Sequence, residues 1–178
     1  AILYDLHTAS VRPNAASGYA AAAAATSEPL PEGRVGAGAG ARVGTLAGDG
    51  GQPGGTGCWA ETFEGHTIGA CAAVNALGAI RDPESGQWVT PRIQAGVTAG
   101  TWRAQTTLVV VTTDAVLDRS SARIVAKMAS AGIARAIEPA FTPFDGDIIF
   151  VLSTCCGEEV GPRALLEVGA AAARCVGR

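Results

Sequence analysis

The sequence predicts a mixed α/β fold in which helices cover buried β-strands. Three observations support it: apolar runs of strand length, Ala-rich or amphipathic stretches of helix length, and the alternation of the two in the second half of the chain. A length of 178 residues suffices for one substantial core. We therefore expect a single domain over residues 1–178.

The first half of the chain is expected to hold a helix, a Gly-rich region and a long strand. Residues 19–25 are Ala-rich and typical of a helix. In residues 35–57 glycine alternates with small residues, which predicts a strand close to another backbone and then a loop over 47–58. The apolar run 67–80 predicts a strand buried on both faces.

The second half is expected to follow the order strand, helix, strand, helix. A strand is predicted over 108–113, and Ser120 or Ser121 can cap the helix that follows. The continuous apolar run 148–152 predicts another strand, and Pro162 suits the first turn of a last helix. Such an order predicts helices packed over sheets.

Composition excludes several classes of function. The formal net charge is -3 and no basic cluster occurs, so no nucleic acid partner is expected. No apolar stretch approaches the roughly 18 residues of a membrane span, and no signal-peptide pattern opens the chain, so we expect no membrane association and a cytoplasmic protein. The Gly-rich region lacks the pattern of a phosphate-binding loop.

The cysteines and histidines are expected to be structural. The number of cysteines is odd and no CxxC pair occurs, so free reduced thiols are predicted and no metal or other cofactor is expected. His7 and His66 are expected at the surface or in loops. A thiolate nucleophile at Cys155 or Cys156 is an alternative, but no base is evident beside them. The five cysteines are Cys58, Cys71, Cys155, Cys156 and Cys175.

Thr106 is the candidate nucleophile, because it stands at the start of the 108–113 strand after a polar, accessible linker over 91–105. A threonine hydroxyl needs a base within hydrogen-bond reach. If the chain were cut after Gln105, the new α-amine, with a reference pKa of about 7.7–8.0, would be that base. A threonine at a strand start is also ordinary β-propensity.

Asp145-Gly146-Asp147 precedes the next apolar strand and can meet Thr106 in one site. In an extended segment the two carboxylates would point the same way and could orient the amine and hydroxyl of Thr106. The same sequence also suits a turn that leads into a strand.

Asn75 and Tyr4 are further candidates. Asn75 lies within an apolar run, where its amide must find a partner; it either donates to an oxyanion or bonds to neighbouring backbone. Tyr4 either donates its hydroxyl to a substrate oxygen or anchors the N-terminal segment.

These residues carry a resemblance to the L-aminopeptidase/D-esterase family, which includes β-peptidyl aminopeptidases and the 6-aminohexanoate-oligomer (nylon oligomer) hydrolase. The resembling segments include 74–76, 106–115, 131–137 and 144–150. A threonine nucleophile combined with Asp-Gly-Asp is closer to the nylon-oligomer hydrolase branch.

The resemblance implies a four-layer αββα sandwich and self-cleavage between Gln105 and Thr106. Residues 1–105 and 106–178 would stay associated, in a homo-oligomer. It also implies that Thr106 is the nucleophile, that Asp145 and Asp147 orient it, and that Asn75 and Tyr4 contact the oxyanion or the substrate.

Three departures from the family pattern stand out. Thr45 occupies a place where a lysine is expected in the nylon-oligomer hydrolase branch, and Gln105 replaces the usual Asn before the nucleophile. Family members also carry a strand-rich segment before the motif that contains Tyr4, so the family's N-terminal segment is expected to be missing and the sandwich incomplete.

The leading hypothesis is therefore a self-processing amidohydrolase that acts on small peptides or amide oligomers with a free amine. One alternative is a non-catalytic member of the family that acts as a binding or assembly subunit. Another is an acyltransferase that uses the same nucleophile.

Overall fold

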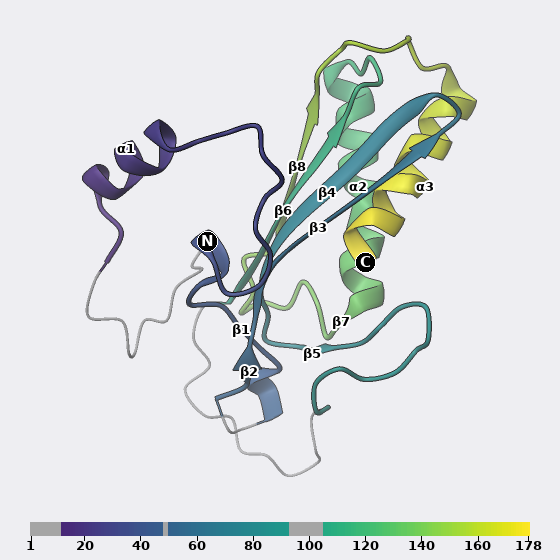
Figure 1. Ribbon diagram of the computed structural model, residues 1–178. Helices are drawn as coiled ribbons and strands as arrows, with labels where there is room; N and C mark the ends of the chain where they lie inside the picture. The colour runs from purple at the N-terminus through teal and green to yellow at the C-terminus, as the bar shows by residue number, and fades with distance from the viewer. Residues whose placement is uncertain (1–11, 48–49, 93–104) are drawn as a thin grey trace.

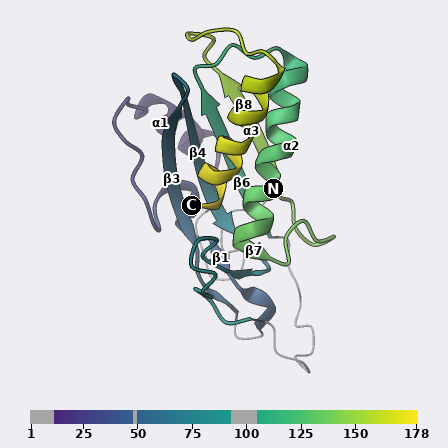
Figure 2. The same cartoon turned by 90° about the vertical axis from the view of Figure 1, so that its right-hand side faces the viewer.

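A four-stranded sheet with two helices on one face forms the centre of the molecule (Figures 1 and 2). The computed structural model describes residues 12–47, 50–92 and 105–178. The strand order is β3-β4-β6-β8, and helices α2 and α3 pack against each other and against the sheet. These elements are β3 (Gly55–Phe63), β4 (His66–Asn75), β6 (Thr106–Thr113), α2 (Arg119–Ala136), β8 (Ile148–Ser153) and α3 (Pro162–Gly177).

The pairing of the strands follows from their connections. Strands β3 and β4 form an antiparallel hairpin, since the short turn at Glu64 and Gly65 joins them directly. Strand β6 pairs antiparallel with β4 and parallel with β8, and α2 forms the crossover that a parallel pair requires. Strand β6 is therefore an inner strand, and β4 and β8 lie along its two edges.

Shorter elements surround one end of the sheet. Helix α1, on which every residue is exposed, stands away from the sheet (Figure 1). The others pair in two small ladders, β1 with β2 and β5 with β7, or form single 3-10 turns. Their bounds are α1 (Ala15–Ala23), η1 (Gly36–Gly38), β1 (Arg42–Val43), η2 (Thr45–Ala47), β2 (Gln52–Pro53), β5 (Ala79–Ile80) and β7 (Ile137–Glu138).

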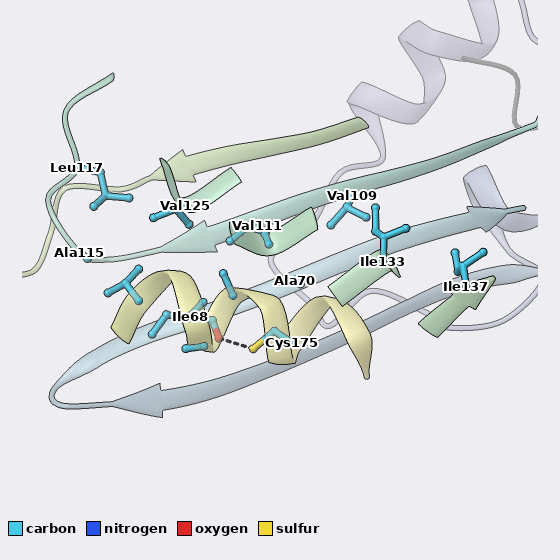
Figure 3. Close-up of a cluster of buried hydrophobic side chains, with 14 of the residues drawn as sticks. Ile68, Ala70, Val109, Val111, Ala115, Leu117, Val125, Ile133, Ile137 and Cys175 are labelled. Carbon is cyan, nitrogen blue, oxygen red and sulfur yellow. Dashed lines mark hydrogen bonds between the residues drawn. The ribbon is translucent and has the colours of Figure 1, made fainter. Parts of the chain in front are cut away.

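The core lies between the sheet and the pair α2 and α3. Alternate residues of β4 and β6 point toward the helices, and Figure 3 shows Val109 of β6 beside Ile133 of α2. Cys175 of α3 completes the core by donating its thiol to the carbonyl of Ile68 at 3.6 Å. Burial raises the pKa of this thiol to about 11, so Cys175 is protonated at neutral pH and packs as a small apolar residue.

Gly132 permits the close approach of α2 and α3. A Cβ at this position would lie 2.4 Å from the carbonyl oxygen of Ala173 and 2.8 Å from Cβ of Val176. We expect Gly132→Ala to lower the free energy of unfolding by about 1–3 kcal/mol, despite the better helix propensity of alanine, because the helices must separate. Chemical denaturation measures this loss. Gly18→Ala, where a Cβ meets nothing within 4 Å, is the control and is expected to unfold like the wild type.

The face of the sheet opposite the helices carries exposed apolar side chains; we refer to it as the open face. Ile148, Phe150 and Leu152 of β8 are 41%, 50% and 56% exposed there, beside Leu108 and Val110 of β6. The described residues thus build a mixed α/β fold with one large sheet and one helix pair, and the second sheet of a four-layer sandwich is not found among them.

The predicted order of strand, helix, strand and helix in the second half is confirmed. Four local predictions were wrong. Within the loop expected over 47–58, strand β3 begins at Gly55. The strand expected in 35–57 is wrong at its start, where the chain forms the turn η1. The strand expected over 67–80 ends at Asn75. Helix α2 is capped by Asp118, whose carboxylate accepts the N–H of Ser121 at 2.7 Å, rather than by a serine.

Candidate active site

Three strands bring the candidate residues together at one end of the sheet. Asn75, the last residue of β4, lies directly opposite Thr106, the first residue of β6. Gln105 forms a parallel bridge with Asp145, in the register of the β6–β8 pairing and three residues before its first pair, Leu108 with Ile148. The site therefore arises because β6 lies between β4 and β8, and it sits at the edge of the open face.

The side chain of Thr106 lies against the peptide carbonyl that precedes it. Thr106 is only 1% exposed, and its Oγ1 donates to the carbonyl oxygen of Gln105 at 2.7 Å. The backbone N–H of Gly146 donates to the same oxygen at 2.7 Å. Two donors thus converge on the carbonyl of the bond expected to be cut, and both draw electron density from its carbon.

Gly146 also lies close to the side chain of Thr106. A Cβ at position 146 would lie 2.8 Å from Oγ1 of Thr106. Real side chains do not approach so closely, so the absence of a side chain at Gly146 leaves the space that the hydroxyl of Thr106 occupies. Sequence reasoning gave Gly146 no role of its own, although its place between the two acids offered a signal.

The carboxylate of Asp147 fixes the start of β6. One oxygen accepts the N–H of Thr107 at 2.7 Å, and the other accepts the N–H of Phe141 at 3.0 Å. The carboxylate therefore ties Thr107 to the loop before β8. In the intact chain its contact is with the neighbour of Thr106, one peptide away from the predicted target.

The carboxylate of Asp145 ties its own turn to the segment that follows β4. Its Oδ1 accepts the N–H of Leu77 at 3.4 Å, and its Oδ2 accepts the hydroxyl of Thr142 at 2.5 Å. The N–H of Thr142 donates to the same oxygen at 3.3 Å. Sequence reasoning missed Thr142; a threonine three residues before an acid at a turn is the signal that could have found it.

The amide of Asn75 is oriented by backbone. Its Oδ1 accepts the N–H of Arg42 at 2.9 Å, which assigns the other terminal atom of the amide as the nitrogen. The Arg42 guanidinium in turn donates to the carbonyls of Gly50 and Gly51. Asn75 stands directly opposite Thr106 in the pairing of β4 with β6.

Thr45 belongs to the turn η2 near this end of the sheet, where Leu46 donates to the carbonyl of Leu77 at 3.1 Å. Its Oγ1 is buried and has no hydrogen-bond partner among the residues that the structure describes. Tyr4, His7 and the linker residues 93–104 lie outside the described residues.

The competing nucleophiles lie elsewhere. Cys155 and Cys156 are exposed and follow the end of β8 that pairs with Thr113. Seven residues of extended strand separate Thr113 from Thr106, or about 23 Å. Cys155 and Cys156 therefore have no part in the site around Thr106.

Two predictions about the other cysteines and the histidines were wrong. Cys58 and Cys71 are directly opposite each other on β3 and β4 and form a disulfide. Their pairing could not be predicted because β3 was not. His66 is buried at the start of β4, with Nδ1 3.7 Å from a carboxylate oxygen of Asp114. In residues 12–47, 50–92 and 105–178, no group of three His, Cys, Asp or Glu is placed to hold a metal.

The fold is that of the N-terminal-nucleophile hydrolase class, as two solved structures show. A β-aminopeptidase from a Burkholderia species matches 91% of this chain and 48% of its own, with a TM-score of 0.65 and 23% identity. The L-aminopeptidase D-Ala-esterase/amidase of Ochrobactrum anthropi, described as a variant of that fold, matches 85% of this chain and 44% of its own, with a TM-score of 0.60 and 26% identity.

The chain belongs to peptidase family S58, which matches residues 1–178. An uncharacterised aminopeptidase of Mycobacterium tuberculosis is 35% identical over 212 residues that cover 100% of this chain and 60% of the relative. A second, from Mycobacterium leprae, is 34% identical and covered to 58%. The chain thus spans roughly three fifths of the length of these relatives. No helix in the described part of the chain is long and apolar enough to cross a membrane.

Proposed function

We propose that the chain is a self-processing amidohydrolase whose nucleophile is Thr106. One observation carries the proposal: the carbonyl oxygen of Gln105 accepts two hydrogen bonds, one from the hydroxyl of Thr106 and one from the N–H of Gly146, each at 2.7 Å. A hydroxyl held against the preceding peptide, together with a donor on its oxygen, is the arrangement that intramolecular attack requires.

In the first reaction, Oγ1 of Thr106 adds to the carbonyl carbon of Gln105. Negative charge develops on the Gln105 oxygen, where the N–H of Gly146 stabilises it. The C–N bond to Thr106 then breaks, and the nitrogen receives the proton lost by the hydroxyl. Water hydrolyses the resulting ester, which leaves a carboxylate on Gln105 and restores the hydroxyl of Thr106, now with a free α-amine.

In the second reaction, that amine acts as the base for attack on a substrate amide. Its reference pKa of about 7.7–8.0 leaves part of it neutral at pH 7. The donor amide of Asn75 stands opposite and would stabilise the new oxyanion. Asp147 holds the strand on which the nucleophile lies, and Asp145 holds the turn that carries Gly146. After cleavage, the two carboxylates would orient the freed amine.

The substrate class we propose is a small peptide or amide oligomer with a free amine. Two relatives are named aminopeptidases, and the Ochrobactrum protein is named an aminopeptidase and amidase. The Thr106 and Asp-Gly-Asp pair favours the nylon-oligomer hydrolase branch. Residues 1–105 and 106–178 would remain associated, because β4 and β6 pair along eight positions across the cut.

Intact-mass analysis of the purified chain during incubation tests this proposal. We expect two fragments, one that ends at Gln105 and one that begins with Thr106, together with hydrolysis of an aminoacyl p-nitroanilide. A chain that stays at full mass and lacks amidase activity would favour the non-catalytic alternative. Transfer of the acyl group to an added amine instead of water would favour the acyltransferase.

A further inference from the structure

The segment 142–146 holds both backbone groups of Gln105, the residue whose carbonyl carbon self-cleavage would attack. The carbonyl of Phe144 accepts the N–H of Gln105 at 3.3 Å, and the N–H of Gly146 donates to the carbonyl oxygen of Gln105 at 2.7 Å. Asp145, between these two residues, forms the bridge with Gln105. The position of the Gln105 carbonyl therefore depends on the conformation of this segment.

The half-buried Thr142 closes the segment into a turn. Its Oγ1 donates to Oδ2 of Asp145 at 2.5 Å and accepts the N–H of Phe144 at 3.3 Å. Its backbone adds two bonds to Asp145: the N–H of Thr142 donates to Oδ2 at 3.3 Å, and its carbonyl accepts the N–H of Asp145 at 3.0 Å. One hydroxyl thus contacts the two residues that directly precede Gly146.

The hydroxyl of Thr142 is also the closer of two donors that orient the carboxylate of Asp145. The N–H of Leu77 reaches Oδ1 of Asp145 at 3.4 Å, against 2.5 Å for the hydroxyl on Oδ2. A short bond from a hydroxyl to a carboxylate is stronger than a bond near the limit of hydrogen-bond length. Loss of the Thr142 hydroxyl would therefore loosen Asp145 more than loss of the contact with Leu77.

We propose that Thr142 is a positioning residue of self-cleavage: its hydroxyl sets the turn that places the N–H of Gly146 on the carbonyl oxygen of Gln105. This inference rests on the proposed function, in which that N–H stabilises the charge that develops on the same oxygen. A donor is effective only within about 2.7–3.1 Å of a developing oxyanion, so a small shift of the turn is enough to slow the reaction. Thr142 acts through Phe144 and Asp145.

The rate of self-cleavage of Thr142→Val, followed by intact mass, tests the inference. Valine keeps the shape of the side chain but removes the hydroxyl, and we expect the rate to fall about tenfold. Thr142→Ser keeps the hydroxyl and is expected to restore the wild-type rate. Thr26→Val is the matched control, because exposed Thr26 accepts the N–H of Glu28 at 3.3 Å, the same local contact that Thr142 makes with Phe144. We expect it to cleave like the wild type.

A second measurement does not depend on cleavage. In 15N-labelled chains that also carry Thr106→Ala, the peptide bond after Gln105 stays intact, and the amide proton resonance of Gly146 reports its bond to the Gln105 carbonyl. A weaker hydrogen bond moves such a resonance upfield. We expect Thr142→Val to cause this shift, and Thr142→Ser and Thr26→Val to leave the resonance in place.

Equal cleavage rates of Thr142→Val and the wild type would overturn the inference and leave the proposed function intact, and so would a Gly146 resonance that does not move. A slow Thr142→Ser variant would also overturn it, since the rate would then not depend on the hydroxyl. A wild-type chain that stays at full mass would instead refute the proposed function, and the Gly146 resonance would decide whether Thr142 sets the turn. If Thr142→Val does not fold, Thr142→Ala, which also lacks the hydroxyl, takes its place.

Discussion

Replacement of Thr106 by alanine is expected to keep the chain at its full mass and to remove amide hydrolysis, by at least about a thousandfold. Both proposed reactions use the same oxygen. Without Oγ1 nothing adds to the carbonyl of Gln105, which it now contacts at 2.7 Å, and without cleavage no α-amine is released. Intact mass over time measures the first loss, and release of p-nitroaniline from an aminoacyl p-nitroanilide measures the second.

Thr112→Val is the matched control for this experiment. Thr112 belongs to the same strand and faces the same side as Thr106, but it is exposed and pairs with Leu152 far from the cut. We expect this variant to cleave and to turn over substrate like the wild type. If the Thr106→Ala chain is also cut after residue 105, a protease, and not the chain itself, makes the cut.

The sequence was sufficient to predict that Thr106 and Asp145-Gly146-Asp147 lie close together, but not how they contact one another. Thr106 and Asp145-Gly146-Asp147 are both placed at strand starts, and parallel pairing of β6 with β8 brings such starts to one edge. Asp147 contacts Thr107 and not Thr106 because of the strand register, and a shift of one residue would change that contact. Patterns of apolar residues do not specify strand register that finely.

The errors in the fold have a shared cause. Strand β3 contains Gly55, Gly57 and polar residues and is an edge strand of the four-stranded sheet, where Thr56 forms an isolated bridge with Gly33, so its sequence lacks the apolar run of a buried strand. Once β3 was taken for a loop, the disulfide between Cys58 and Cys71 had no basis either. The central strands were predicted well, because their burial against α2 and α3 requires an apolar sequence.

Gly146→Ala is expected to slow self-cleavage by about a hundredfold while the chain stays folded. The backbone at Gly146 is not in the left-handed region, so alanine adds no conformational strain there. Its N–H also remains to bond the carbonyl of Gln105. The added methyl group, however, would lie 2.8 Å from Oγ1 of Thr106, so the hydroxyl must move away from the carbon that it attacks. The rate at which the full-length mass disappears measures this effect.

Gly161→Ala controls for the loss of a glycine as such, because a Cβ there meets nothing within 4 Å, and we expect it to cleave like the wild type. Thermal unfolding of both variants separates a folding defect from a catalytic one. If Gly146→Ala cleaves as fast as the wild type, the space beside Gly146 does not determine the position of the Thr106 hydroxyl relative to the carbonyl carbon of Gln105. The polarisation of the Gln105 carbonyl by the Gly146 N–H, which both proteins share, would then be the main contribution of this turn to the reactivity of the peptide bond.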